Sequence, residues 1–105
     1  AVLAPWVIRF NSTGNETLYA DIAKALGDNF EGLSAEKASL KAHEAFLYLF
    51  EKVGFSPYLK DYGIQQAEVK ALALKAHRAG QRLINTNIRE ISEEQAIRLF
   101  QEAYG

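Results

Sequence analysis

The sequence predicts an all-α fold, a helical bundle of about five to six helices, from three observations. Apolar residues recur at spacings of three and four along most of the chain, which is the period of an amphipathic helix. Residues that start or stop helices, such as Ser34 and Gly54, stand at the ends of these periodic segments. Strand signals are scarce, because only Val2–Phe10 is rich in β-forming residues and Pro5 argues against a central strand there.

The first capping signal lies at Thr13–Glu16, which matches a capping box. In that motif the Thr13 hydroxyl accepts from the Glu16 amide, and the Glu16 carboxylate reaches back to the Thr13 amide. The helix that follows is predicted to end at Gly27, because glycine readily adopts a left-handed cap. Its apolar face is predicted to consist of Leu18, Ile22 and Leu26.

A long helix is predicted over residues 35–53, with Ser34 as its N-cap and Gly54 as its left-handed C-cap. Two apolar stripes run along it, so we expect this helix to be buried on two sides and to form the centre of the bundle. The first stripe comprises Ala38, Ala42, Ala45, Phe46, Leu49 and Val53, and the second comprises Leu40, Leu47 and Phe50.

Three further helices are predicted in the second half of the chain. Ser56-Pro57 is typical of the N-cap and first position of a short helix, which Gly63 would close. Another helix is predicted from Gln66 to about Ala79, and a second capping box at Ser92–Gln95 begins the last one. The predicted inward residues are Val69, Leu72, Ala73 and Ala76 in the former helix, and Ala96, Ile97, Phe100, Ala103 and Tyr104 in the latter.

The composition limits the classes of function. A chain of 105 residues favours one domain, residues 1–105, which would bury roughly two-thirds of its unfolded surface. The net charge of -1 predicts no nucleic-acid binding, and the apolar opening is too short to span a membrane. The absence of cysteine excludes disulfides, thiolate metal sites and a cysteine nucleophile, and it favours a reducing, cytoplasmic location.

The two histidines are the side chains here that ordinarily titrate near neutral pH. His43-Glu44 begins like the zinc motif H-E-x-x-H, but Leu47 occupies the position of the second ligand. His77 belongs to a different predicted helix, and neither histidine has a carboxylate cluster around it in sequence. Each lies at the border of an apolar stripe, so packing at that border is a simpler interpretation than a metal or catalytic role.

The remaining patterns do not define a catalytic or cofactor-binding site. Ser34, Ser56 and Ser92 lie at predicted N-caps, and no G-x-S-x-G surrounds them. The glycines are scattered, so no phosphate-binding loop is indicated. A basic run could bind a phosphate-bearing ligand or an acidic partner, although a solvated helix face is the simpler interpretation. That run consists of Lys75, Arg78, Arg82 and Arg89.

Four segments, taken in order, resemble the C-terminal helical domain of the iron-containing (group III) alcohol dehydrogenases. The first, AVLAPWVIRFN, resembles the helix after the last metal-binding histidine of that family, and YADIAKALG resembles the next helix. The third, EGLSAEKASLKAHEAFLYLFEKVGFSPYLKDYGI, is similar to the family's long helix and the short proline-containing turn after it. The fourth, QRLINTNIREISEEQAIRLFQEAY, is similar to the closing segment. The ordered resemblance covers essentially the whole chain.

This resemblance implies the C-terminal helical part of an NAD(P)-dependent alcohol dehydrogenase that uses iron or zinc. In the family, an N-terminal Rossmann-like domain binds NAD(P), and an aspartate and three histidines hold the metal ion. All of these would lie before Ala1, so the chain would be a fragment of a longer two-domain enzyme. Its partner would be the missing dinucleotide-binding domain, and a homo-oligomer is also compatible. We expect the chain alone to bind neither metal nor NAD(P) and to be inactive.

The resemblance also implies that the chain forms one wall of the active-site cleft and helps to exclude water from it. The candidate wall residues are Trp6 and Phe10 in the first segment and Leu83 and Asn87 in the closing one. Ordinary packing is the simpler alternative for all four. The closing segment has Ile88 where the family usually has the proline of Asn-Pro-Arg, which leaves the shape of this loop open.

The alternative function is a stand-alone helical protein-interaction module. The two hypotheses differ in the role of the apolar start, Ala1–Phe10. A dehydrogenase fragment would pack this segment on an upstream part of the chain and expose it when isolated, whereas a free module would be a self-contained monomer. A histidine followed by glycine shortly before Ala1 would favour the dehydrogenase, and a start codon there would favour the module.

Overall fold

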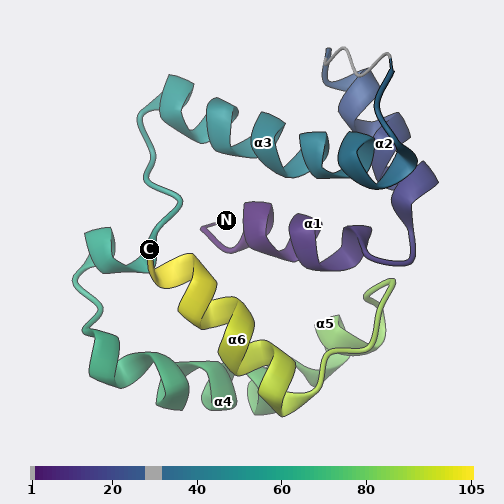
Figure 1. The fold of residues 1–105 in the computed structure, drawn as a ribbon. Coiled ribbons are helices and arrows are strands. Elements are labelled where there is room, and N and C mark those ends of the chain that lie inside the picture. The colour runs from purple at the N-terminus through teal and green to yellow at the C-terminus, as the bar shows by residue number, and fades with distance from the viewer. Residues whose placement is uncertain (1, 28–31) are drawn as a thin grey trace. The chain divides into compact units, whose positions relative to one another are not determined.

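The computed structural model of this chain describes residues 2–27 and 32–105. Within these ranges every regular element is helical, with six α-helices and two short 3-10 helices (Figure 1). The predicted all-α bundle is therefore confirmed. The chain divides into two compact units, Ala1–Pro57 and Tyr58–Gly105. In the described ranges, no helix combines the length and the apolar character that a membrane span requires.

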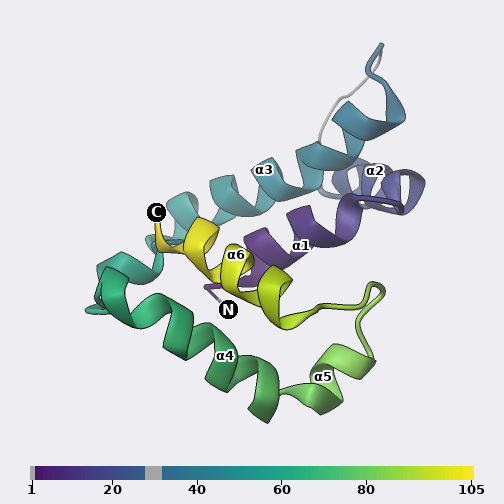
Figure 2. The same ribbon diagram turned by 60° about the horizontal axis from the view of Figure 1, so that its bottom comes forward.

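The first unit contains α1 (Ala4–Ser12), α2 (Glu16–Ala25) and α3 (Ala35–Val53). Helix α3 packs against both of the others, and α1 runs alongside it in two views (Figures 1 and 2). Pro5 lies in the first turn of α1, where a proline needs no amide partner and its fixed φ suits a helix. The same proline that argues against a strand therefore helps to begin a helix.

The core of the first unit is built largely from small side chains. Ala23 on α2 and Ala42 on α3 are completely buried, and they form a cluster with the buried Tyr19. Ile8 and Ile22 pack against the edge of this cluster. Because alanine adds so little bulk, the backbones of α2 and α3 can approach closely at this contact.

Both ends of α3 lie where the sequence predicts them. The Ser34 hydroxyl accepts a hydrogen bond from the Lys37 amide at 3.2 Å. Gly54 is left-handed with φ 80°, and the Phe55 amide donates to the Phe50 carbonyl at 2.9 Å. These contacts satisfy orphan groups at the two ends of the helix. The predicted span, residues 35–53, is confirmed.

The prediction that α3 is buried on two sides is wrong for much of its length. Ala38 and Ala42 are buried, whereas Leu49 and Val53 of the same stripe are exposed, Val53 to 58%. Leu40 of the second stripe is exposed as well. The reason is length: α3 has 19 residues, but α1 has 9 and α2 has 10. Two short helices leave much of the long one uncovered.

The predicted capping box at Thr13 is also wrong. Thr13 is the C-cap of α1, and Asn15 is the N-cap of α2. The Glu16 carboxylate accepts from the Gly14 amide at 3.1 Å instead of reaching back to Thr13. Because α1 continues to Ser12, Thr13 is already used to end the preceding helix. The buried residues of α2 are Tyr19, Ala20 and Ala23, while the predicted Leu18 and Leu26 are exposed.

The second unit contains the 3-10 helices η1 (Leu59–Tyr62) and η2 (Gln66–Glu68) and the helices α4 (Val69–Ala79), α5 (Gln81–Asn85) and α6 (Glu93–Tyr104). Helices α4 and α6 pack together, and η1 contacts α6. The Ser92 hydroxyl accepts from the Gln95 amide at 3.1 Å, and the Ser92 amide donates to the Gln95 side chain at 2.9 Å. The second predicted capping box is therefore confirmed. The buried apolar residues of this unit are Leu59, Val69, Ala73, Ala96, Leu99, Phe100 and Ala103.

Two helix starts in this part of the chain differ from the prediction. Ser56 is not an N-cap, because η1 begins only at Leu59 and has Tyr58 as its N-cap. The Pro57 carbonyl instead accepts a hydrogen bond from Nε1–H of Trp6 at 2.8 Å. The helix predicted from Gln66 begins as the 3-10 turn η2 and becomes α-helical at Val69. Helix α5 was not predicted, and Ala76 is exposed although the pattern places it inward.

Candidate functional site

The candidate site lies in the second unit, on residues 83–92, which we call the wall segment. Its position is set by Gly80, where α4 ends and α5 begins. A Cβ atom on residue 80 would lie 2.9 Å from the backbone carbonyl oxygen of Ala76, a distance that real Cβ contacts do not reach. Glycine therefore allows the chain to end α4 and to begin α5 one residue later, at Gln81. Helix α5 carries Leu83.

The polar run Asn85-Thr86-Asn87 ends α5 and turns the chain. The Thr86 hydroxyl donates to the Leu83 carbonyl at 2.9 Å, and the Asn87 amide donates to the Ile84 carbonyl at 3.1 Å. The Asn87 side-chain nitrogen donates to the Arg89 carbonyl at 2.9 Å. Such side-chain bonds to nearby backbone replace the helix ladder where the helix stops. Much of the polarity of this run is therefore explained by backbone geometry.

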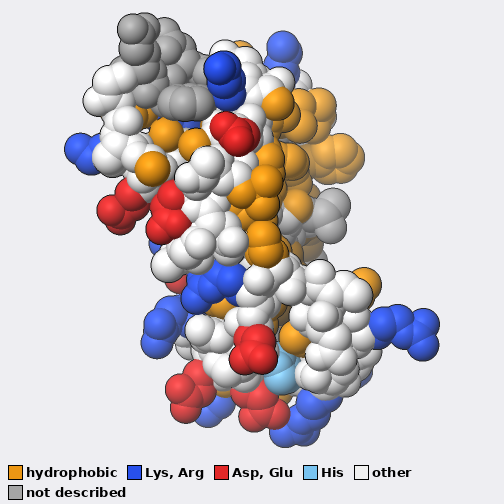
Figure 3. Space-filling view, turned by 90° about the vertical axis from the view of Figure 1, so that its right-hand side faces the viewer, with side chains coloured by type: hydrophobic (Ala, Val, Ile, Leu, Met, Phe, Trp, Pro, Cys, Tyr) orange, Lys and Arg blue, Asp and Glu red, His pale blue; other side chains and the backbone are white. Residues whose placement is uncertain are grey.

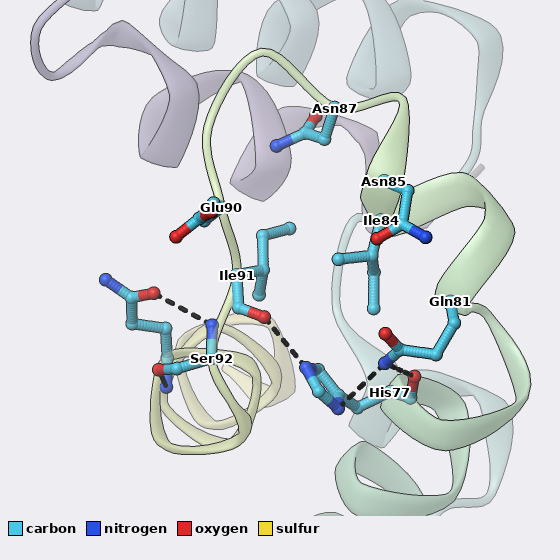
Figure 4. A pocket seen from close by; sticks show the side chains of 9 residues that line it. His77, Gln81, Ile84, Asn85, Asn87, Glu90, Ile91 and Ser92 are labelled. Atoms are coloured by element: carbon cyan, nitrogen blue, oxygen red, sulfur yellow. Dashed lines mark hydrogen bonds between the residues drawn. The ribbon is translucent and has the colours of Figure 1, made fainter.

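A hollow of about 370 Å³ lies between the wall segment, α4 and the start of α6 (Figure 4). Ile84 and Ile91 face each other across it, and polar side chains supply most of the remaining lining. The hollow therefore combines a small apolar surface with several hydrogen-bonding groups. Its lining residues are His77, Gln81, Ile84, Asn85, Asn87, Glu90, Ile91, Ser92 and Gln95.

His77 connects α4 to the far end of the wall segment. Its Nε2 atom lies 2.7 Å from the carbonyl oxygen of Ile91. Because a carbonyl only accepts, Nε2 carries the proton and donates. The side-chain nitrogen of Gln81 lies 3.3 Å from Nδ1 of the ring and 2.6 Å from the His77 carbonyl. Both ring nitrogens of His77 therefore have partners within the second unit.

This role of His77 was missed by the sequence reasoning, which treated the residue as packing at a stripe border. Its main partner is a backbone carbonyl 14 residues away. Any residue supplies such a carbonyl, so the partner leaves no signature in the sequence. The i, i+4 spacing of His77 and Gln81 was the available hint, because that spacing places two side chains next to each other on a helix.

Leu83 lies on α5, and Asn87 lies two residues after the end of that helix; contact of either residue with a substrate stays a prediction. Leu83 is 76% exposed, and Ile88 is 48% exposed. Asn87 is half-buried and lines the hollow. Leu83 lies on α5 and Ile88 on the turn that follows, so the segment has exposed apolar side chains at and just before a turn whose backbone is held by hydrogen bonds.

Trp6 and Phe10 belong to α1 of the first unit. Trp6 is 7% exposed, and its ring centroid lies 5.1 Å from that of His43. Nδ1 of His43 lies 2.6 Å from the Pro5 carbonyl oxygen, so this ring nitrogen donates to the backbone. Phe10 is half-buried. Packing accounts for the contacts of Trp6, while contact of either residue with substrate stays a prediction. In residues 2–10, the part of the apolar start that the structure describes, Pro5 and Trp6 are buried and the other apolar side chains are half-buried, so the exposed patch expected of an isolated fragment is not seen there.

Exposed apolar side chains gather elsewhere on the first unit (Figure 3). A groove of about 540 Å³ lies between the end of α2 and the C-terminal half of α3. Leu49 and Tyr48 of α3 line it and are both exposed. This uncovered surface follows directly from the excess length of α3.

The basic run is solvated along α4. Arg78 lies 3.8 Å from the Glu93 carboxylate, with both side chains more than half exposed. Lys75 and Arg82 are also exposed. Exposed pairs of this kind contribute little to stability. The arrangement supports a solvated helix face rather than a phosphate site.

The described residues do not fit a metal ion. In the ranges 2–27 and 32–105 no group of three or more His, Cys, Asp or Glu side chains could hold one. His43 and His77 each donate a ring N–H to a backbone carbonyl. No step through a metal ion can therefore be assigned to these residues.

We predict that adding Fe²⁺, Zn²⁺ or NAD to this chain leaves its melting temperature unchanged within about 1 °C. A ligand at a hundred times its Kd stabilises a protein by about 2.7 kcal/mol. For a chain of this size that corresponds to a shift of roughly ten degrees or more. Differential scanning fluorimetry with and without EDTA measures the effect. A reproducible shift of several degrees that EDTA reverses would mean that the chain has a metal site of its own.

Comparison with known proteins extends these observations. The family model for the C-terminal part of the Fe-containing alcohol dehydrogenase family matches residues 1–104. Lactaldehyde reductase of Escherichia coli K12 is 35% identical over 104 residues, which are 99% of this chain and 27% of the relative. The 1,3-propanediol dehydrogenase of Klebsiella pneumoniae is 34% identical over 99% of this chain and 26% of the relative. Sulfoacetaldehyde reductase of Bilophila wadsworthia is 31% identical over 93% of this chain and 26% of the relative.

The all-α fold and the match along nearly the whole sequence define a C-terminal helical domain of oxidoreductases. This chain belongs to the Fe-containing alcohol dehydrogenase family, and it corresponds to the family's C-terminal part. The resemblance inferred from the four segments is thereby confirmed. The chain spans about a quarter of the length of the relatives it matches.

Proposed function

We propose that this chain forms one wall of the active-site cleft in a longer NAD(P)-dependent alcohol dehydrogenase that uses iron or zinc. The match of residues 1–104 to the family's C-terminal part carries this proposal. The metal ligands and the dinucleotide-binding domain would lie in the part of the longer protein that precedes this chain. The chain alone would accordingly be inactive. A cytoplasmic location, which the cysteine-free sequence favours, is part of the same proposal.

The geometry of the wall segment supports this role. Leu83 is largely exposed, and the backbone beneath it is held by the Thr86 and Asn87 hydrogen bonds. A cleft wall requires a fixed backbone and apolar side chains that displace water from the reacting atoms. Leu83, with Ile88 beside the turn, would supply that apolar surface. Asn87 would supply a polar group at its edge.

We propose a short alcohol or aldehyde with a second polar group as the substrate. The relatives are named for propanediol, lactaldehyde and sulfoacetaldehyde, which are all compounds of two or three carbons. A single exposed leucine next to polar side chains suits a ligand of that size better than a long aliphatic chain. This chain would contribute shape and exclusion of water, while the bound metal ion would polarise the alcohol oxygen.

The direct test uses the longer protein, loaded with Fe²⁺ or Zn²⁺ and supplied with NAD or NADP. We expect reduction of the dinucleotide with propane-1,3-diol or propane-1,2-diol, and loss of this activity with a chelator. Deleting residues 1–105 should lower the rate by at least about a hundredfold, because misplacing groups around a reacting centre has effects of that size. Equal rates with and without residues 1–105 would contradict the proposal.

We predict that Leu83→Trp raises the KM for the alcohol about fivefold in the longer protein, because the larger ring would narrow the cleft. The melting temperature should change by no more than about 1 °C, since exposed positions tolerate substitution. Leu18→Trp is the matched control, because Leu18 is an exposed leucine on α2 in the other unit. An unchanged KM for the alcohol in Leu83→Trp would contradict the proposal that Leu83 lines the cleft.

A further inference from the structure

His77 does more than pack at the border of α4. We propose that His77 is a positioning residue that holds the wall segment, residues 83–92, in the shape in which it would face the substrate. This inference rests on the proposed function and names the group that supports the wall. It concerns described residues of the second unit alone.

The first observation is how the far end of the wall segment is held. Between Thr86 and Ser92 the chain contains no helix or strand, so no backbone ladder fixes it. The bond from His77 Nε2–H to the Ile91 carbonyl, at 2.7 Å, joins this irregular stretch to the regular helix α4 (Figure 4). The bond is partly buried, which limits the access of water that could replace the donor.

The second observation is that the His77 side chain also contacts Gln81, just before the near end of the wall segment. Gln81 is the first residue of α5, and its side-chain nitrogen lies 3.3 Å from His77 Nδ1. The same nitrogen lies 2.6 Å from the His77 carbonyl. One imidazole therefore contacts the start of the helix that carries Leu83 and the residue that precedes the Ser92 cap. Leu83 and Asn87 both lie on the stretch of chain that His77 spans.

The same contacts distinguish positioning from catalysis. Both ring nitrogens have partners inside the second unit, so His77 would act on the substrate only through the backbone it holds. A role limited to stability would lower the melting temperature without affecting the alcohol. A positioning role would weaken binding of the alcohol specifically, because the wall would spend less time in the competent shape.

The experiment compares His77→Ala, His77→Gln and Arg78→Ala in the longer protein. Loss of a partly buried hydrogen bond shifts a local equilibrium by roughly tenfold. We therefore expect His77→Ala to raise the KM for propane-1,3-diol about tenfold, with the KM for NAD(P) changed by less than about twofold. Glutamine places a nitrogen donor at nearly the position of imidazole Nε2, so His77→Gln should stay within about threefold of the unsubstituted protein.

Arg78→Ala is the matched control. Arg78 is the next residue on α4, and its contact with Glu93 is long and exposed, so all kinetic constants should stay within about twofold. Amide hydrogen exchange followed by mass spectrometry gives a second measurement on the same proteins. The peptide covering residues 86–92 should exchange about tenfold faster in His77→Ala, and at nearly the original rate in His77→Gln.

Two results would overturn the inference. One is an alcohol KM in His77→Ala within about twofold of the original despite a lower melting temperature, which would make the role purely structural. The other is a His77→Gln protein as impaired as His77→Ala, which would assign the effect to ring packing. If the unsubstituted longer protein oxidises no alcohol, the proposed function fails instead. The exchange rates then still decide whether His77 holds the segment.

Discussion

Replacing Trp6 with alanine should lower the free energy of unfolding of this chain by about 3–5 kcal/mol, the range typical of a buried aromatic residue cut back to a methyl group. Trp6 is nearly fully buried, its ring lies against that of His43, and its Nε1–H donates to the Pro57 carbonyl at 2.8 Å. The substitution would remove all of these contacts at once. Urea unfolding followed by far-UV circular dichroism measures the loss, since Trp6 is also the only tryptophan available for fluorescence.

Two further variants separate the causes. Trp6→Phe keeps an aromatic ring but removes the donor to Pro57, so it should lower the free energy of unfolding by about 1–3 kcal/mol. Tyr48→Ala, at an exposed aromatic position on α3, should change it by no more than about 0.5 kcal/mol. If Trp6→Ala proves as mild as Tyr48→Ala, the packing interpretation of Trp6 fails and a role at the cleft becomes the better account.

Replacing Phe100 in the second unit with alanine should lower the free energy of unfolding by a similar amount, about 3–5 kcal/mol. Phe100 is 8% exposed on α6, the helix that packs against α4. The contact between these helices also supports the wall segment, since α4 carries His77 and α6 begins just after Ile91. The same urea titration measures the loss of stability.

The matched control for this prediction is Arg98→Ala, an exposed position on the same helix. It should change the free energy of unfolding by no more than about 0.5 kcal/mol. A loss below about 1 kcal/mol for Phe100→Ala would indicate that this site collapses easily around the missing ring. The interface of α4 and α6 would then be a poor support for the wall segment.

The sequence predicts those parts of the fold that depend on neighbouring residues. Ser34, Gly54 and the Ser92–Gln95 box act within one helical turn, and each lies where the pattern places it. The Thr13 prediction fails because two helices compete for the same short connection, and the pattern alone cannot show that α1 continues to Ser12. The local pattern shows that Thr13 could serve as an N-cap, but the length of α1 determines that it serves as a C-cap.

Burial is harder to predict than helix position. The apolar stripes of α3 continue to Val53, but covering them depends on the lengths and placement of α1 and α2. An apolar stripe therefore indicates what a helix can bury, and only the packing shows how much of it is covered. Val53, more than half exposed, illustrates the difference.

The candidate site was predictable only through the family resemblance. Leu83 and Asn87 were chosen because the closing segment resembles the family's; Leu83 lies on α5 and Asn87 just after it, and their role at a cleft stays a prediction. His77 could not be found in the same way, because its partner is the carbonyl of Ile91. Contacts to backbone depend on how the chain folds back, which side-chain patterns do not encode.

The central claim, that this chain is the wall-forming C-terminal part of a longer metal-dependent dehydrogenase, is tested most directly by the coding sequence immediately upstream of Ala1. We predict an open reading frame that continues upstream for about three quarters of the length of the relatives, in proportion to the quarter that this chain spans. It should contain a histidine followed by glycine shortly before Ala1 and further histidines upstream. A start codon at or just before Ala1 would contradict the claim.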